Sequence, residues 1–587
     1  MAQTWHWHPA SAAIASFGLA GLCLTAIPSS AQISPDQTLG NESSIVSPNA
    51  AVHGFPAELI QDGATRGVNL FHSFSQFNVR DGQRVYFANP VGIETILSRV
   101  TGADPSRIFG TLGVNGTANL FLINPNGILF GPNARLDVAG SFLASTASSF
   151  KFPDGSEFSA TNPQAPPLLT VNIRPGLQYG TNHQATIANA GNLTAGKDLT
   201  LAAGNLDLQG QLQAGGDLTL RALDTVKVRD SVTTPFIATA GGKLMVQGDL
   251  AIDIFALNHP NSGFFSGGDM VLRSANPISG DAHYTAGGGL RFEQLNGAPG
   301  GLISLDDPVL LVNGDVFLGD YVGPSLHIVA GGNVFLGNVT ITGPGGIGTT
   351  INPLNPDPFL SSLSFTDYGV VDGFTQGTLD VRAGLDWAGL PIFSNSGVGF
   401  PFVTSFPFTP LVSNPTGSTI SVGNITNTNG IGSIYLSNQY FPNPFVLSGS
   451  IFTESINTFG NLVLDSRGGI FTGGNIDTGS NLPVNAGNIK LLANGNIITG
   501  GTIESSVKVG GVGNGGDITL ISRLGNIDTQ GGFVNSSTGL GLSGDITFTA
   551  FGNIVTGSNS ATGLPAVGSY IGAGGTGIAG RVTLTSQ

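Results

Sequence analysis

The sequence predicts an all-β protein built as a right-handed parallel β-helix with an N-terminal β-helical domain. Three observations support this fold class. Glycine supplies 89 of 587 residues, only 10% of the residues are charged, and a short phrase with alternating apolar residues recurs along the chain. So much glycine weakens helix interiors, and so few charges leave few of the pairs that stabilise solvated helices. Because 40% of the residues are apolar, disorder is not expected.

The recurring phrase places small residues before a short alternating strand. Its first six copies read AGKDLTL at Ala195, AGGDLTL at Ala214, AGGKLMV at Ala240, SGGDMVL at Ser266, AGGGLRF at Ala286 and AGGNVFL at Ala330. After a gap it resumes as GNLVL at Gly460, GNIKL at Gly487, GDITL at Gly516, GDITF at Gly544 and GRVTL at Gly580. A period of roughly 20 to 30 residues is typical of a solenoid.

Each phrase predicts one coil of the solenoid. Apolar residues that alternate, such as Leu199 and Leu201, predict a strand with one buried face. The glycines before each strand are expected to supply corners with positive φ. Stacked coils bury their apolar faces against each other, and parallel crossovers favour the right hand. A leucine-rich solenoid is the alternative, but the helical and asparagine-ladder signatures that it needs are not expected here.

Residues 1–31 are predicted to be a signal peptide. They contain an uncharged apolar run from Ala12 to Ile27, and the small residues Ser29, Ser30 and Ala31 follow it. This spacing predicts cleavage between Ala31 and Gln32, although the segment has no Lys or Arg. The alternatives are a buried hydrophobic helix and a membrane anchor, for which the run is short. Cys23 is the single cysteine, so the mature chain is expected to have no disulfide.

The rest of the chain divides into four parts that differ in composition and repeat pattern. Residues 32–185 form a distinct N-terminal domain, 186–345 and 451–587 are β-helix repeats, and 346–450 are an irregular excursion rich in Pro and Phe. The stretch FPFVTSFPFTP, which contains Phe402 and Phe406, has two interpretations. It packs the excursion onto the flank of the rod, or it is an aromatic surface that binds a glycan or protein partner.

One turn motif stands out within residues 32–185. It reads Asn124-Pro125-Asn126-Gly127 and is followed by Ile128. Pro125 presets φ for the second position of a turn, Asn126 and Gly127 tolerate the left-handed conformation, and the side chain of Asn124 can cap the turn. The motif is therefore expected to join two buried strands tightly.

The stretch from VNLFHSFSQFNVRDG through NLFLINPNGILFGPNARLDVAGSFLAST resembles the secretion domain of filamentous-haemagglutinin-like exoproteins of two-partner secretion (TpsA-type), above all the cyanobacterial type. NPNG followed by Ile is the signature motif of that family. Asn89-Pro90 corresponds to a second site where the family carries a variable NPNL motif, although Val91 and Gly92 depart from it here.

This resemblance implies a route and a partner. Family members pass through the Sec pathway to the periplasm and are recognised by the periplasmic transport-associated domains of an outer-membrane transporter (TpsB-type). The residues from Asn124 to Ile128 act by shaping the fold or by direct recognition. The product is expected to be secreted or held at the outer-membrane cell surface as an adhesin with a host-cell or surface glycan or protein receptor. The alternatives are the stalk of a truncated effector or toxin-delivery protein and a β-helical polysaccharide-active enzyme.

Composition argues against other classes of function. The net charge is −15 and Lys and Arg form no cluster, so no nucleic-acid partner is expected. The histidines share no metal-ligand spacing, and no nucleophile motif or phosphate loop occurs. We therefore expect no enzymatic activity, no catalytic residues, no metal and no cofactor. The chain ends on a repeat strand at Gln587, so the membrane barrel of an autotransporter is not expected, and the protein is either short or a truncated product.

Overall fold

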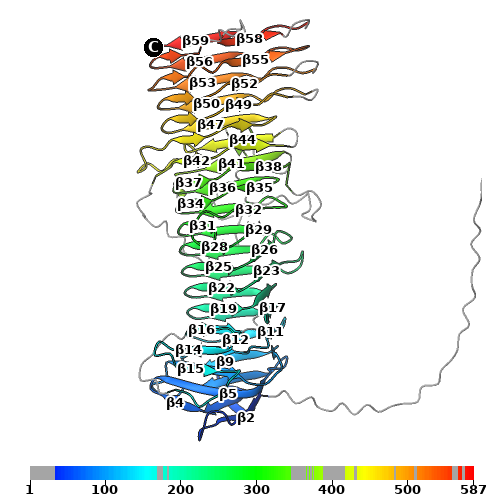
Figure 1. Cartoon of the computed structure of the whole chain (residues 1–587), viewed down its shortest axis with the longest axis vertical. Coiled ribbons are helices and arrows are strands. Elements are labelled where there is room, and N and C mark those ends of the chain that lie inside the picture. Colours follow the sequence, from blue (N-terminus) through cyan, green and yellow to red (C-terminus); the bar gives the residue numbers. More distant parts are fainter. Residues whose placement is uncertain are drawn as a thin grey trace, which may run out of the picture.

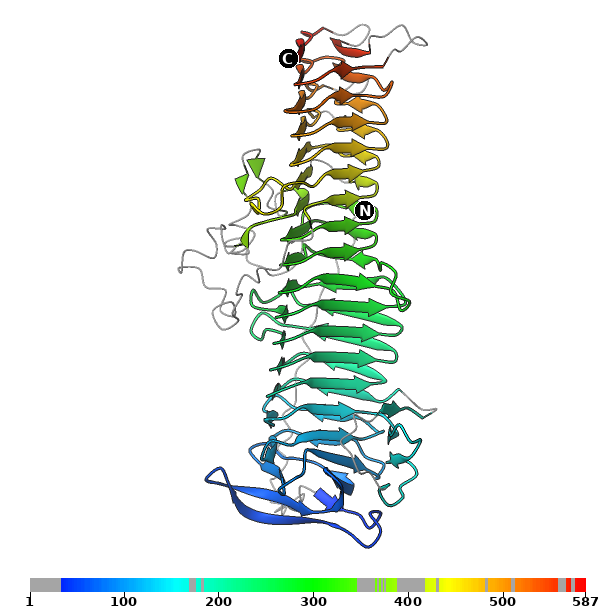
Figure 2. The same ribbon diagram turned by 90° about the vertical axis from the view of Figure 1, so that its left-hand side faces the viewer.

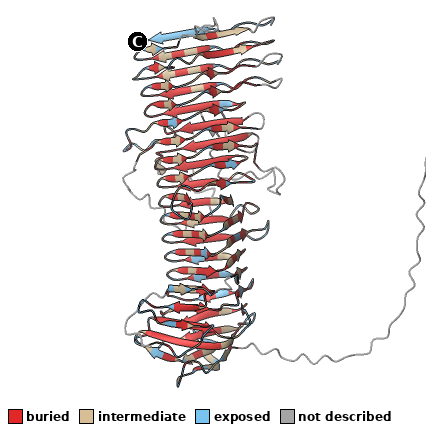
Figure 3. Cartoon of the chain, in the orientation of Figure 1, coloured by how far each residue is buried: buried red, intermediate tan, exposed pale blue. Residues whose placement is uncertain are grey.

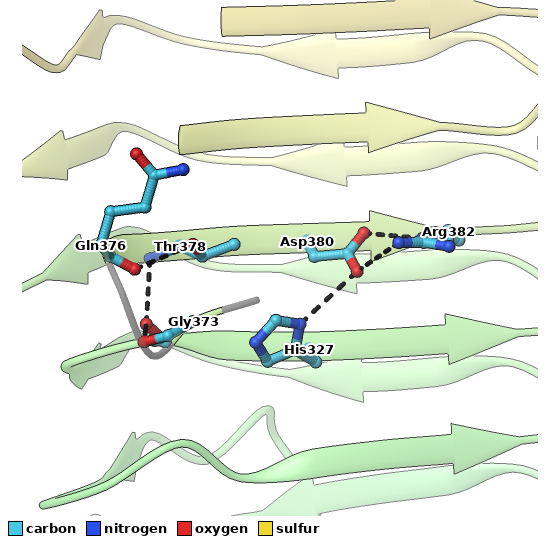
Figure 4. Close-up of polar contacts among 7 residues, drawn as sticks. His327, Gly373, Gln376, Thr378, Asp380 and Arg382 are labelled. Atoms are coloured by element: carbon cyan, nitrogen blue, oxygen red, sulfur yellow. Dashed lines mark hydrogen bonds and ion pairs between the residues drawn. The ribbon is translucent and has the colours of Figure 1, made fainter. Parts of the chain in front are cut away.

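The computed structural model describes residues 33–167, 176–180, 184–345, 365–366, 369–370, 373, 376–387, 417–428, 432–480, 484–507, 512–557, 566–571 and 576–587. These residues form a rod of stacked coils (Figures 1 and 2). Three parallel sheets, A, B and C, run along the rod, and the chain visits them in the order A, C, B in successive coils. In Figure 4, β41 (Gly377–Arg382) runs left to right in front of the strand behind it and later coils lie above, so the helix is right-handed. The predicted fold class is confirmed.

Sheet A holds the strands that follow most copies of the first phrase, and its parallel members pair in register from coil to coil. They are β5 (Asn69–Phe77), β7 (Thr95–Val100), β10 (Asn119–Ile123), β13 (Phe142–Ser145), β19 (Leu199–Ala203), β22 (Leu218–Ala222), β25 (Leu244–Gly248), β28 (Met270–Ser274), β31 (Leu290–Glu293), β34 (Val316–Leu318), β37 (Val334–Leu336), β42 (Ile420–Val422), β45 (Ile451–Thr453), β48 (Ile470–Thr472), β51 (Ile497–Thr499), β54 (Ile527–Asp528) and β57 (Ile554–Val555).

From β7 onward, a strand of sheet C follows each strand of sheet A, after a short corner in most coils. The segment with the separate sheet β14 to β16 (residues 149–178) lies between β13 and β17. Its members are β8 (Ser106–Ile108), β11 (Ile128–Phe130), β17 (Thr186–Asn189), β20 (Asn205–Leu208), β23 (Thr225–Arg229), β26 (Ala251–Phe255), β29 (Ile278–Asp281), β32 (Leu302–Ile303), β35 (Tyr321–Gly323), β38 (Val339–Ile341), β43 (Ile425–Asn427), β46 (Ile456–Asn457), β49 (Ile476–Asp477), β52 (Ile503–Glu504), β55 (Val534–Thr538) and β58 (Val567–Ile571).

Sheet B closes each coil. Besides β41, its parallel members are β3 (Phe55–Asp62), β6 (Arg84–Ala88), β9 (Thr111–Asn115), β12 (Arg135–Asp137), β18 (Asn192–Ala195), β21 (Gln211–Ala214), β24 (Ile237–Ala240), β27 (Gly263–Ser266), β30 (His283–Ala286), β33 (Val309–Val312), β36 (Leu326–Ala330), β44 (Gly432–Ser437), β47 (Asn461–Ser466), β50 (Ile489–Ala493), β53 (Ile518–Ser522), β56 (Ile546–Ala550) and β59 (Val582–Ser586).

The core is one continuous stack of apolar side chains inside the rod. A single cluster of buried residues reaches from Ile33 to Ala550, and the buried residues alternate with more exposed ones along most strands (Figure 3). Each coil covers the apolar ends of its inner face with the coils above and below it, as the repeats predicted for a solenoid. Among the described residues there is no helix long and apolar enough to cross a membrane.

The glycines of the repeated phrases do not act as predicted. Gly215, Gly241 and Gly267 all lack positive φ. A Cβ atom on any of them would instead overlap the carbonyl oxygen of the equivalent glycine in the preceding coil, as Gly267 would with Gly241. These positions need glycine because the backbones of stacked coils approach too closely for a side chain. The expectation of positive-φ corners at these phrases is wrong.

Side-chain ladders of Asn and Asp line the corners. Asp320 Oδ1 accepts the backbone N–H of Asn338 at 2.8 Å, and Asn338 Oδ1 accepts that of Asn424 in the next coil at 3.0 Å. A second ladder links Asn461, Asn488, Asp517, Asp545 and Arg581 in the same way. The ladders satisfy corner N–H groups that no strand pairs. The expectation that asparagine ladders are absent is wrong, and their presence does not make the fold a leucine-rich solenoid, because no α-helix occurs among the described residues.

The copies of the phrase before the gap and those after it lead into strands of different sheets. Copies such as those at Ala195 and Ala214 lead into sheet A through β19 and β22, whereas the copies at Gly460 and Gly487 lead into sheet B through β47 and β50. Between them, β41 to β44 pair in the three sheets. The rod therefore continues through the described part of 346–450. The domain boundaries of the sequence analysis stay predictions.

The N-terminal end is capped by antiparallel strands. β1 (Ile33–Pro35) and β4 (Ala64–Arg66) pair with β5, and β2 (Ser44–Val52) pairs with β3. A register shift between Ser47 and Ala50 interrupts β2 next to Pro48, which makes its outer edge a poor template for another strand. A separate sheet of β14 (Ser149–Lys151), β15 (Glu157–Ser159) and β16 (Gly176–Gln178) packs beside the first coils, and β39 (Phe365–Thr366) pairs with β40 (Gly369–Val370).

Two tyrosines inside the rod allow a matched test of core polarity. Tyr284 and Tyr321 are fully buried, and Tyr321 Oη donates to the carbonyl of Ser325, whereas Tyr284 Oη has no hydrogen-bond partner among the described atoms. We expect Tyr321→Phe to cost about 1–2 kcal/mol and Tyr284→Phe to be neutral or slightly stabilising, because only the first removes a bond. Urea denaturation of both variants measures this, and equal losses would contradict it.

Candidate functional site

The NPNG motif forms the corner between β10 in sheet A and β11 in sheet C. Gly127 N donates to Asn124 O at 3.1 Å, which closes a turn with Pro125 and Asn126 in the middle. Gly127 has a φ of +116°, whereas Asn126 is not among the residues with positive φ. Of the two residues that tolerate the left-handed conformation, only Gly127 has a positive φ. This is the order of residues that a type I turn favours.

Asn124 ties this corner to the coil below it. Its side chain is buried, and its Oδ1 accepts the N–H of Asn126 at 3.0 Å, the capping bond that the sequence predicted. Its Nδ2 donates to Asp104 O and to Ser106 Oγ, both at 3.0 Å. Both polar atoms of the Asn124 side chain therefore form hydrogen bonds inside the protein. A buried polar atom without such a bond would lower the stability.

The other residues of the motif divide between surface and core. Asn126 is exposed, although its Nδ2 donates to Gly102 O at 2.7 Å, and Pro125 is partly exposed. Ile128 is buried and pairs with Ser106 and Ile187 in the neighbouring coils. In the folded domain only Asn126 and part of Pro125 are open to a partner.

The second Asn-Pro pair lies at a different corner, between β6 in sheet B and β7 in sheet A. Asn89 Oδ1 accepts the N–H groups of Thr117 at 3.0 Å and Ala118 at 3.1 Å, one coil above. Pro90 O accepts the N–H of Ile93 at 3.1 Å across a turn in which Gly92 has a φ of +88°. The structure does not bring this pair together with the NPNG corner, but both asparagines join successive coils.

The predicted cleavage site lies outside the described residues. Ala31 and Gln32 precede β1, the first described element, which begins at Ile33.

A buried polar network that sequence reasoning missed closes the N-terminal end. Arg99 is fully buried, and its guanidinium donates to Ser73 Oγ at 2.9 Å, Thr38 Oγ1 at 2.7 Å and Ser159 O at 2.9 Å. Asp36 accepts from Ser73 Oγ at 2.9 Å. One arginine thereby joins the segment after β1, the second coil and the separate sheet, three parts that the linear sequence keeps apart.

The two charges of this network respond differently to their surroundings. Burial lowers the pKa of Arg99 to about 10, and the charge of Asp36 opposes that shift. Burial tends to raise the pKa of Asp36, but hydrogen bonds from Thr101, Thr38 and Ser73 outweigh it, so the pKa is lowered. Both groups are therefore ionised at neutral pH.

Comparison with known proteins identifies this region. Residues 31–292 match the family model described as the TPS secretion domain. This chain carries a TPS secretion domain. The resemblance noted in the sequence is thus confirmed over residues 31–292. The match to the TPS secretion domain passes residue 185, where parallel pairing also continues from β13 to β19.

Two solved structures are similar to the chain. The secretion domain of filamentous hemagglutinin is 20% identical, with a TM-score of 0.24, and the alignment covers 52% of this chain and 95% of that one. The HMW1 secretion domain from Haemophilus influenzae is 13% identical, with a TM-score of 0.26, and the alignment covers 84% of this chain and 95% of that one. No curated protein sequence matches the chain.

A second polar cluster, formed by His327, Asp380 and Arg382, lies on the outer side of sheet B (Figure 4). Arg382 Nε and Nη2 each donate to Asp380 at 2.9 Å, and His327 Nδ1 lies 3.5 Å from Asp380 Oδ2. All three side chains are fully buried. Burial tends to raise the pKa of Asp380, but Arg382 and His327 outweigh it and the pKa is lowered. The Asp-x-Arg alternation would suit a solvated strand face, so the sequence contains no signal of this burial.

This cluster holds two neighbouring coils together. It joins β36 to β41, and the guanidinium of Arg382 also lies 4.2 Å from the ring centroid of Tyr440. The described residues contain no group of three or more His, Cys, Asp or Glu that could hold a metal ion. The aromatic surface predicted at Phe402 and Phe406 lies outside the described residues.

Proposed function

We propose that this TPS secretion domain is the address by which a cognate outer-membrane transporter exports the chain. The chain would enter the periplasm through the Sec pathway, cross the outer membrane unfolded and fold outside. The observation that supports this most directly is the family match over residues 31–292. The capped N-terminal end offers a physical reason for growth from that end, since each later coil needs a folded neighbour.

Deletion of residues 32–185 with residues 1–31 kept tests the export proposal. The truncated chain is expected to stay inside the cell, whereas the full chain reaches the medium in cells that carry the transporter. Immunoblots of medium and periplasm measure this, with a transporter-deficient strain as the control. Release of the truncated chain at the level of the full chain would exclude residues 32–185 as the address.

For the NPNG motif we propose a role in shaping the corner rather than direct recognition. Asn124→Ala removes the bonds to Asp104 and Ser106 and is expected to cost about 2–3 kcal/mol, because buried polar groups lose their partners. It is expected to reduce secretion in parallel. The matched variant Asn126→Ala alters an exposed side chain and is expected to preserve both properties. Urea denaturation and secretion assays on the two variants separate the roles.

The opposite pattern would favour recognition. If Asn126→Ala abolishes secretion while the purified protein remains as stable as the wild type, the transporter reads the motif directly.

Outside the cell we propose that the rod acts as an adhesin or surface structure. Its length of stacked coils can hold a binding region away from the surface that carries it. A stalk for an effector is the second candidate, and we assign no catalytic role. Adhesion of cells that display the full chain, compared with cells that lack it, tests this proposal.

A further inference from the structure

The loop at residues 438–447 leaves the rod after β44 and presents apolar side chains to solvent. Phe445 is 82% exposed and Leu447 is 86% exposed, while Val446 between them is buried. Figure 2 shows the segment that follows β44, in yellow, standing off the side of the rod. The buried side chain of Val446 holds the loop against the protein while Phe445 and Leu447 face solvent. This arrangement indicates an interaction surface.

Arg467 holds this loop in place from beneath. Its guanidinium donates to the carbonyls of Asn438 at 2.9 Å, Asn443 at 3.1 Å and Val446, and it also reaches Gly384 O at 3.3 Å. The side chain of Arg467 is itself buried. These hydrogen bonds fix the backbone of the loop, so that the side chains of Phe445 and Leu447 remain exposed to solvent.

Three N–H groups at the tip are bonded within the protein, and two prolines have none. Pro442 and Pro444 have none, Asn443 N donates to Gly384 O at 2.9 Å, Phe445 N to Asn443 Oδ1 at 2.9 Å and Val446 N to Asn443 O at 3.1 Å. A segment can enter an apolar medium at low cost only when its backbone polar groups are satisfied internally. Glycan recognition would instead need free hydrogen-bonding groups beside the ring.

Charge distinguishes between lipid surfaces. Residues 438–447 contain no Asp, Glu, Lys or Arg, and the whole chain has a net charge of −15. An anionic membrane would repel the chain, whereas a zwitterionic surface would not. No charged group at the tip must lose its hydration as the tip enters.

We propose that loop 438–447 is a membrane-contact loop that inserts Phe445 and Leu447 into the interface of a zwitterionic lipid surface. Phe441, which is 40% exposed, lies at the edge of the same tip. Contact through two or three side chains is weak and reversible by itself, as expected of an interfacial anchor rather than a spanning segment.

Flotation of the purified full chain with phosphatidylcholine vesicles tests the proposal. The wild type is expected to float with the vesicles, and the double variant F445S/L447S is expected to lose about tenfold or more in partition coefficient, because both inserted side chains are removed. Admixed phosphatidylglycerol is expected not to strengthen binding. The control F551S/L524S removes Phe551 and Leu524, which are 57% and 74% exposed elsewhere on the rod, and should float like the wild type.

Three outcomes would overturn the proposal. They are a wild type that does not float, an F445S/L447S variant that floats as well as the wild type, and binding that requires phosphatidylglycerol. The first would leave an apolar protein surface as the partner of the loop. Because both substituted side chains are exposed, circular dichroism and melting of the double variant should match the wild type, and the test does not depend on folding.

Discussion

Gly267→Ala is expected to destabilise the rod by at least about 3 kcal/mol, more than a typical overpacking substitution. The added Cβ would overlap Gly241 O, a backbone atom in the preceding coil. A flexible side chain could move away, but this carbonyl belongs to the stacked backbone of β-helix coils. The two coils must therefore separate, and the parallel pairing of β25 with β28 weakens with them.

The neighbouring glycine provides the matched control. A Cβ on Gly268 would lie 3.2 Å from Gly242 O, and neither glycine has positive φ. Gly268→Ala is therefore expected to cost less than about 1 kcal/mol, since a shift of a few tenths of an ångström relieves it. Hydrogen exchange of amides in β25 and β28, compared with β50 and β53 in the same chain, measures the local loss. Equal effects at the two positions would show that coil stacking does not set the requirement for glycine.

Acidification is expected to destabilise the N-terminal coils through His72. This side chain is fully buried in β5, its Nδ1 lies 2.9 Å from Ser44 Oγ, and its Nε2 has no partner among the described atoms. Burial lowers the pKa of His72 from 6.5 to about 3. Below pH 6.5, His72 therefore binds a proton in the unfolded chain but not in the folded chain. The stability is fully present above pH 6.5 and is lost as the pH falls toward 3.

The expected slope is about 1.4 kcal/mol per pH unit in that window, or about 2 kcal/mol between pH 6.5 and 5. Hydrogen exchange of β5 and β6 amides, corrected for intrinsic rates, measures it in the full chain. His72→Asn removes the titrating group and is expected to flatten the profile. A slope that survives His72→Asn would assign the acid sensitivity to another group.

The sequence was sufficient for the rod and its handedness. Alternation at Leu199 and Leu201 and the repeated small residues predict coils, because the period of a strand and the need to bury one face are local properties. The NPNG turn and the capping role of Asn124 were also predictable, since Asn, Pro and Gly have fixed preferences at turn positions.

Contacts between coils were decided only by the tertiary structure. The glycine of each phrase is required by a backbone one coil away, and the Asn and Asp ladders donate and accept across coils. Arg99 gathers segments that lie about sixty residues from it in the chain, and Arg467 fixes a loop through carbonyls that carry no sequence signal. Sequence determined how each coil forms, whereas the stacking of coils determined what each corner residue does, because its partner is a backbone atom of another coil.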